Sequence, residues 1–212
     1  MTIRETRVLF PSGDLRLEGM LASPEGATQA MVVCHPHPEY GGTMDNPVVA
    51  VLAERAAHAG LATLRFNFRG VGGSDGAYSG TFAESEDAHA AALFLRERTA
   101  LERLTLVGYS FGAMVASLAA ARESLIERLV AVALPATMFD TRFLETCDKP
   151  KLFLLGEEDD YCPPAALQAL VARLPGRNEL RILAGADHFL FGYEEEIAAE
   201  ILAFLEEPAT EA

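Results

Sequence analysis

LTLVGYSFGAMVASLAAA, residues 104–121, places an apolar strand, a tight turn and an apolar helix directly after one another. The turn, GYSFG at residues 108–112, matches the pattern Gly-x-Ser-x-Gly. In that pattern a strained turn raises the serine hydroxyl above the sheet, and small residues on both sides leave room for the turn. The serine also lies at a helix N-terminus, whose free N–H groups favour developing negative charge. These features predict that Ser110 is a nucleophile; the alternative is a chance match in a glycine-rich α/β protein.

A serine hydroxyl needs a base that accepts its proton, and the chain offers five histidines for this role. His58 and His89 fall inside predicted helices, while His35 and His37 follow a strand upstream of the serine. His188 lies in the loop GADHFLFG, between the last predicted strand and the last predicted helix. This placement predicts that His188 is the base. The alternative is a loop histidine held by local hydrogen bonds.

The third member of such a site is a carboxylate in a loop at the C-terminal end of a strand. The run LGEEDDY supplies two candidates after the predicted strand KLFLL, namely Asp159 and Asp160. Only one of these adjacent side chains can face His188, and the other caps the next helix or is solvated. Asp187 is next to the histidine in sequence and is expected to be a turn residue. The residues alone therefore leave the acid as Asp159 or Asp160.

The rest of the chain alternates predicted strands with predicted helices. Strands are expected at Thr6–Phe10, Leu15–Ala22, 30–34, 61–68, Leu104–Val107, Leu129–Ala133, Lys151–Leu155 and Leu180–Leu183. Helices are expected at 46–60, Phe82–Arg98, Phe111–Arg122, Pro164–Leu174 and Glu194–Leu205. The first two strands are expected to be antiparallel edge strands. The alternation predicts one α/β domain at residues 1–206, a mostly parallel sheet with helices on both faces, and a short solvated tail at 207–212.

The connection between Ala133 and Lys151 decides whether a cap covers the site. It has about seventeen residues, enough for a short helix at Phe139–Thr146 but not for an inserted cap domain. We therefore expect an open active site.

Composition excludes several kinds of partner. The 17 Lys and Arg residues against 31 Asp and Glu residues give a net charge of −14, which predicts no binding to nucleic acid or to a membrane surface. The three cysteines, Cys34, Cys147 and Cys162, lack disulfide or metal-ligand patterning. The N-terminus has no apolar signal core, and the longest wholly non-polar stretch, Leu129–Pro135, is too short to span a bilayer. We expect a cytoplasmic monomer or homodimer that acts on a small molecule.

The order Ser110, Asp159 or Asp160, His188 is the Ser–acid–His order of the α/β-hydrolase fold. The sequence resembles that superfamily over nearly its whole length. Further matching segments are PSGDLRLEGMLASP, VVCHPHPEYGG, FNFRGVGGSDG, LGEEDDYCP and GADHFL. The chain looks most like the small, capless serine hydrolases of the dienelactone-hydrolase-like group, so the resemblance implies a single-domain α/β-hydrolase fold without a cap.

The acid motif of that group is similar to Gly-x-x-Asp-x-x-x-Pro. It matches Gly156, Asp159 and Pro163, so the resemblance favours Asp159. Dienelactone hydrolase itself has cysteine as its nucleophile where this chain has Ser110, a difference that argues against lactone hydrolysis.

The resembling families also use two backbone N–H groups to hold an oxyanion, one after the third strand and one after the nucleophile. The first of these loops reads HPHP here, at residues 35–38. Proline has no N–H to donate, so the expected donors are the backbones of His37 and Phe111. The alternative is a metal site in the His-x-His pattern of His35 and His37, which Glu39 follows. The prolines restrict the geometry of this loop, and no third ligand is evident.

Two further groups of residues lie near these loops. GVGGSDG at residues 70–76 does not have the dinucleotide-binding spacing and resembles the Arg-Gly-x-Gly-x-Ser turn of the hydrolase superfamily, with a structural role. The aromatic residues Tyr40, Tyr109 and Phe189 are expected to line an apolar substrate pocket, and so are the nearby residues Phe111, Met138, Phe139 and Phe191; the alternative is a place in the core.

These features predict a carboxylesterase-like serine hydrolase, which cleaves small carboxylic esters or thioesters through an acyl-enzyme intermediate. The reaction requires no cofactor and no metal. The alternatives are a lactone or amide hydrolase that uses the same residues, and a non-catalytic binding protein with the same fold.

Overall fold

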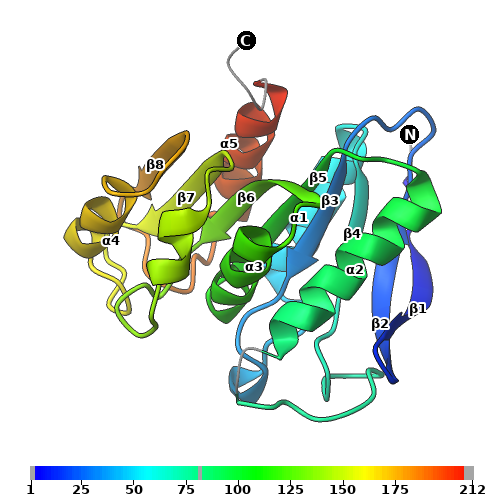
Figure 1. Ribbon diagram of the computed structural model, residues 1–212. Coiled ribbons are helices and arrows are strands. Elements are labelled where there is room, and N and C mark those ends of the chain that lie inside the picture. Colours follow the sequence, from blue (N-terminus) through cyan, green and yellow to red (C-terminus); the bar gives the residue numbers. More distant parts are fainter. Residues whose placement is uncertain (1–2, 81–82, 208–212) are drawn as a thin grey trace.

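One sheet of eight strands runs through the molecule in the order β1-β2-β4-β3-β5-β6-β7-β8 (Figure 1). The computed structural model describes residues 3–80 and 83–207. The strands are β1 (Thr6–Ser12), β2 (Leu15–Ala22), β3 (Ala30–Cys34), β4 (Ala62–Phe66), β5 (Leu104–Tyr109), β6 (Ile126–Val132), β7 (Lys151–Gly156) and β8 (Asn178–Leu183). Strand β2 is antiparallel to both β1 and β4, and all other neighbouring strands are parallel. The sheet is therefore mostly parallel.

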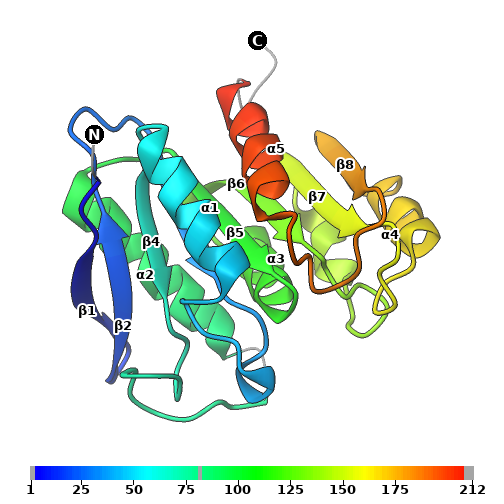
Figure 2. The same ribbon diagram turned by 180° about the vertical axis from the view of Figure 1, so that it is seen from behind.

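Helices cover both faces of this sheet. They are α1 (Pro47–His58), α2 (Glu84–Thr99), α3 (Phe111–Arg122), α4 (Pro164–Val171) and α5 (Glu194–Glu206), with the 3-10 turns η1 (Pro38–Tyr40) and η2 (Arg142–Thr146). Figure 1 shows α2, α3 and α4 in front of the sheet, and Figure 2 shows α1 and α5 on the opposite face. The prediction of an α/β fold with helices on both faces is confirmed.

The central strands β3, β4 and β5 are buried along their whole length, as expected for parallel strands covered on both faces. Successive side chains on a strand face opposite sides of the sheet. Met31 and Val33 accordingly pack in the core beneath α1 and α5, whereas Val32 packs in the core beneath α2 and α3. The apolar run at residues 30–34 thus contributes side chains to the hydrophobic cores on both faces of the sheet.

The structure corrects several expected boundaries. Only β1 is an edge strand at the N-terminal side, because β2 pairs with β4. Instead of a helix at Phe139–Thr146, the structure has the 3-10 turn η2, in which Leu144 is the one buried residue and cannot supply an apolar helix face. The predicted start of α2 at Phe82 lies outside the described residues. Residues 133–150 contain no other regular element, so no cap domain lies between β6 and β7.

The glycine-rich turn after β4 is bonded to β2 through Glu18. The Glu18 carboxylate accepts hydrogen bonds from Asn67 Nδ2 at 2.7 Å and from the Gly73 N–H. The Glu18 N–H donates to Ser74 Oγ at 3.0 Å, and the Ser74 hydroxyl donates to the Asn67 carbonyl at 2.7 Å. At Gly72, which has a φ of +55°, a Cβ would lie 2.3 Å from the Glu18 carboxylate. The positive φ and the close approach of the hydrogen-bonded Glu18 carboxylate therefore both favour glycine at position 72, consistent with a structural role for the turn.

Burial alone would raise the pKa of Glu18, but hydrogen bonds from Gly73, Asn67 and Arg7 and the charge of Arg7 outweigh burial and lower it. The folded state therefore favours the ionised carboxylate. This contribution to stability is complete above the pKa of Glu18 in the unfolded chain and is lost as pH falls through the lower pKa of the folded state.

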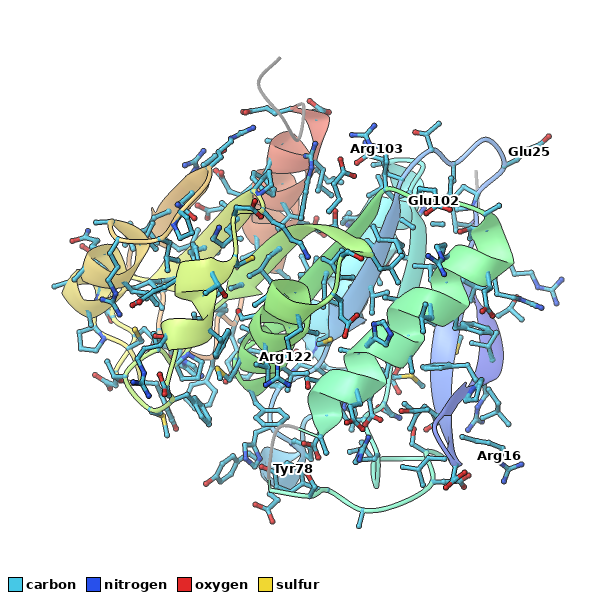
Figure 3. The ribbon with its side chains drawn as sticks, in the orientation of Figure 1. Arg16, Glu25, Tyr78, Glu102, Arg103 and Arg122 are labelled. Carbon is cyan, nitrogen blue, oxygen red and sulfur yellow. The ribbon has the colours of Figure 1, made fainter. Side chains whose placement is uncertain are left out.

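We expect Glu18→Ala to lower the free energy of unfolding by about 2–3 kcal/mol, because it leaves the buried amide of Asn67 and the backbone N–H of Gly73 without their acceptor. Urea denaturation at pH 7 measures this change. The matched control is Glu25→Ala, which removes an exposed carboxylate on the turn between β2 and β3 (Figure 3) and is expected to change stability by at most about 0.5 kcal/mol. Equal destabilisation by the two substitutions would contradict the structural role of Glu18.

Candidate active site

Ser110 occupies a strained turn between β5 and α3. Its φ of +54° and ψ of −117° lie outside the regions that side-chain-bearing residues favour, and its N–H donates to the Val132 carbonyl at 2.8 Å. A Cβ at Gly108 would lie 2.0 Å from the Gly112 carbonyl oxygen, and a Cβ at Gly112 would lie 2.4 Å from the Cys34 carbonyl oxygen. Both flanking positions therefore require glycine.

The structure brings Ser110, His188 and Asp159 together. The Ser110 hydroxyl donates to His188 Nε2 at 2.9 Å, and His188 Nδ1–H donates to Asp159 Oδ2 at 2.8 Å. The three residues follow β5, β8 and β7, whose carboxyl ends meet at one edge of the sheet, as in other open α/β sheets. The Asp159 side chain is completely buried, and 8% of the His188 side chain is exposed.

Hydrogen bonds distinguish the two candidate carboxylates. Asp159 Oδ1 accepts from the backbone N–H groups of Tyr161 at 2.8 Å and Cys162 at 2.9 Å, which leaves Oδ2 directed at His188. Asp160 is exposed. The Asp159 side chain thus points into the site and the Asp160 side chain is exposed, in agreement with the motif match at Asp159.

The loop that carries His188 is fixed from two sides. The Tyr109 hydroxyl donates to the carbonyl oxygens of His188 and Phe189, both at 3.1 Å. Asp187 Oδ1 accepts from the N–H groups of Phe189 at 2.9 Å and Leu190 at 3.2 Å, so Asp187 is the turn residue that the sequence indicates. Burial, together with the charges of Asp187, Asp159 and Glu194, raises the pKa of Tyr109 and keeps its phenol protonated as a donor.

Sequence reasoning missed Tyr161. Its ring stacks on the His188 imidazole with 4.2 Å between ring centroids and 30° between the planes. The sequence gives no periodicity or motif for this contact, which depends on the path of the chain after Asp159. Tyr161 restricts the imidazole on one face while Tyr109 holds its backbone.

The two expected oxyanion donors lie at the same end of the sheet as Ser110. Phe111 is the first residue of α3, so its N–H has no acceptor within the helix. His37 immediately precedes η1 and lines the same cavity as Ser110. The His37 ring is engaged elsewhere: Nε2 is hydrogen-bonded to the Tyr78 hydroxyl at 3.0 Å, and Nδ1 accepts from the Glu39 N–H at 3.2 Å. Tyr78 lies on the loop between β4 and α2 and is labelled in Figure 3.

His35 has both ring nitrogens occupied. Nδ1–H donates to the Pro36 carbonyl at 2.6 Å, and Nε2 accepts from the Phe68 N–H at 3.1 Å. This pattern leaves no lone pair for a metal. In residues 3–80 and 83–207, no group of three His, Cys, Asp or Glu side chains has the geometry of a metal site. The metal alternative for His35, His37 and Glu39 therefore has no structural support.

Burial lowers the pKa of His35 to about 4, although the hydrogen bond to Pro36 opposes this shift. The unfolded chain binds a proton at His35 below about pH 6.5, whereas the folded protein binds it only near pH 4, so acidification between these values favours unfolding. We expect His35 to lower the free energy of unfolding by about 2 kcal/mol as the pH falls from 7 to 4.5. Urea denaturation of the wild type and His35→Gln at both pH values measures this loss as the difference between their pH dependences. Parallel pH profiles would contradict a buried neutral His35.

A cavity of about 480 Å³ opens at Ser110. Of the residues expected in a substrate pocket, Tyr40, Tyr109, Phe189 and Phe191 line this cavity, whereas Phe111, Met138 and Phe139 do not. Its other lining residues are Pro36, His37, Gly41, Gly42, Asn46, Pro47, Val48, Ser110, Tyr161 and His188. The cavity thus lies between the segment from β3 to α1 and the His188 loop, and Ser110 is part of its wall.

A family model of the α/β-hydrolase fold matches residues 29–146, more than half of the chain. An uncharacterised protein of Rickettsia prowazekii (strain Madrid E) is 32% identical over 209 residues, covering 94% of this chain and 88% of the relative. The chain therefore belongs to the α/β-hydrolase-fold family.

Solved structures agree with this assignment. An α/β serine hydrolase homologue from Coxiella burnetii has a TM-score of 0.85 at 33% identity and covers 97% of this chain and 98% of its own. An α/β serine hydrolase without a lid from Xanthomonas campestris has a TM-score of 0.84 at 28% identity, with coverage of 100% and 99%. These similarities support hydrolase activity and the absence of a cap. Among the described residues, no helix combines the length and apolar character needed to cross a membrane.

Proposed function

We propose that this protein is a serine esterase that hydrolyses small carboxylic esters or thioesters through an acyl-enzyme. The hydrogen bonds from Ser110 to His188 at 2.9 Å and from His188 to Asp159 at 2.8 Å carry this proposal. They give the serine a base within proton-transfer distance and give the base a buried carboxylate partner.

In the first half of the reaction, His188 Nε2 accepts the Ser110 proton as Oγ attacks the ester carbonyl carbon. Asp159 keeps the other ring proton on Nδ1 and stabilises the imidazolium that forms. The N–H groups of His37 and Phe111 donate to the oxyanion, aided by the N-terminus of α3. His188 then gives its proton to the leaving oxygen of an ester, or to the leaving sulfur of a thioester. The bond from this atom to the acyl carbon breaks, the alcohol or thiol departs, and the acyl group stays on Ser110 Oγ.

In the second half, water enters the position that the leaving group has vacated. His188 accepts a proton from this water, and the resulting hydroxide attacks the acyl carbon. Collapse of the second tetrahedral intermediate releases the acid and returns the proton to Ser110. Each step uses a group of this chain, so the mechanism requires no cofactor.

We expect Ser110→Ala to lower the turnover of a short-chain ester by about 10⁶-fold, because the nucleophile and its proton-transfer partner act as a unit. Ser117→Ala is the matched control, since it removes a buried serine hydroxyl of the same helix that has no hydrogen-bond partner among the described residues. Initial-rate assays, with circular dichroism to verify folding, measure the effect. Retention of a tenth of the activity by Ser110→Ala would refute the nucleophile assignment.

Asp159→Asn and Asp160→Asn test the acid. The first substitution allows the wrong imidazole tautomer and is expected to reduce kcat by about 10⁴-fold. The second changes an exposed side chain and is expected to leave kcat within about twofold. Measurement of kcat for both variants with one ester compares them directly, and the reverse pattern would transfer the role to Asp160.

A further inference from the structure

Exposed aromatic side chains are concentrated at the cavity above Ser110. The large hydrophobic side chains exposed among the described residues are Leu9, Tyr40, Met138, Tyr161, Phe189 and Phe191. Four of these six, all of them aromatic, line the Ser110 cavity. Exposure of so much apolar surface is costly in water unless a ligand covers it during function. The concentration therefore points to an apolar ligand group at this site.

Three of these rings form a continuous surface that begins beside the His188 imidazole. Tyr161 stacks on the His188 ring at 4.2 Å, Phe189 meets Tyr161 edge-on at 6.5 Å, and Phe191 stacks on Phe189 at 6.2 Å. We call Tyr161, Phe189 and Phe191 the aromatic wall. Tyr40 also lines the cavity, with its ring 4.9 Å from that of His37. Ring faces and edges thus form much of the apolar surface around the cavity.

Proton transfer determines which part of an ester meets the aromatic wall. The leaving oxygen must come within hydrogen-bond distance of His188 Nε2, since this atom returns the proton. The carbonyl oxygen must instead meet the N–H groups of His37 and Phe111. The alcohol part of the ester, which is attached to the leaving oxygen, is therefore placed beside His188 and against the aromatic wall.

We propose, on the basis of the esterase function above, that the substrate is an ester of an aromatic alcohol, whose ring packs on the aromatic wall. Aromatic rings prefer offset-stacked and edge-to-face arrangements, which a wall made of rings provides at several positions. An aliphatic group of similar size gains the burial but not the ring–ring contact. The acyl part has no comparable aromatic surface assigned to it, so selectivity is expected on the alcohol side.

Two series of esters with matched chemical reactivity test this proposal. In the alcohol series, 2-phenylethyl acetate, 2-cyclohexylethyl acetate and ethyl acetate share one acyl group and have leaving groups of similar basicity. In the acyl series, ethyl 3-phenylpropanoate is compared with ethyl propanoate. We expect kcat/KM for 2-phenylethyl acetate to exceed that for ethyl acetate by about tenfold or more, with the cyclohexyl ester between them and a smaller ratio in the acyl series.

The double substitution Phe189→Leu with Phe191→Leu retains apolar side chains and removes two rings of the aromatic wall. It is expected to lower kcat/KM for 2-phenylethyl acetate to the value for 2-cyclohexylethyl acetate, which is a severalfold loss of selectivity. Met138→Ala is the control, because Met138 is exposed but does not line the cavity, and it is expected to preserve the wild-type ratios.

Each failure identifies the statement that is wrong. Hydrolysis of ethyl acetate with a phenylethyl-to-ethyl ratio near one would overturn the aromatic alcohol while the esterase function stands. A larger selectivity ratio in the acyl series than in the alcohol series would also overturn the aromatic alcohol. So would a phenylethyl-to-ethyl ratio that the double substitution does not change. A ratio near one together with a lower molecular mass of the double variant in light scattering would assign the rings to contacts between copies instead. Absence of Ser110-dependent hydrolysis of every ester would overturn the esterase function itself.

Discussion

The close approach of α3 to the backbone that follows β3 is the constraint on which the site depends. A single added carbon at Gly112 would lie 2.4 Å from the Cys34 carbonyl oxygen and 2.5 Å from that of His35. Because there is no side chain at this position, the first turn of α3 can lie directly against the loop that carries His37. The same approach requires the abrupt turn at Ser110, so Ser110 and both expected oxyanion donors share one backbone arrangement. The strain at Ser110 is offset by the packing of the buried helix behind it.

The part of the site that contains His188 and Asp159 is held by hydrogen bonds rather than by close backbone packing. Tyr109, the residue before Ser110, holds the His188 loop through two carbonyl oxygens. Two N–H groups fix the Asp159 carboxylate after β7. The distance from Ser110 to His188 is therefore set by a residue of the turn itself, and the orientation of the imidazole is set by a neighbouring strand end.

The sequence predicts the parts of this arrangement that depend on local patterns. Buried apolar runs at residues 30–34 and 104–107 indicate parallel strands, and the glycines around Ser110 indicate the turn. The residues alone do not distinguish Asp159 from Asp160, because that choice depends on which carboxylate meets the N–H groups of Tyr161 and Cys162 after folding.

Other features depend on contacts between distant segments, which no local pattern records. The position of β2 inside the sheet follows from its pairing with β4, which joins residues as far apart in sequence as Gly19 and Phe66. The extension of β6 back to Ile126 follows from pairing with β5 through an irregular register. The stacking of Tyr161 on His188 and the bond between Tyr78 and His37 likewise join loops that are far apart in sequence.

The His188 loop alternates between buried and exposed residues: His188 and Leu190 are buried, whereas Phe189 and Phe191 are exposed. The buried residues, with Tyr109 and Asp187, fix the backbone, while the exposed residues project their side chains into the cavity. Substitution of these exposed side chains therefore leaves the backbone that positions the His188 imidazole unchanged. The surface of the cavity at Phe189 and Phe191 is thus separable from the hydrogen bond that joins Ser110 to His188.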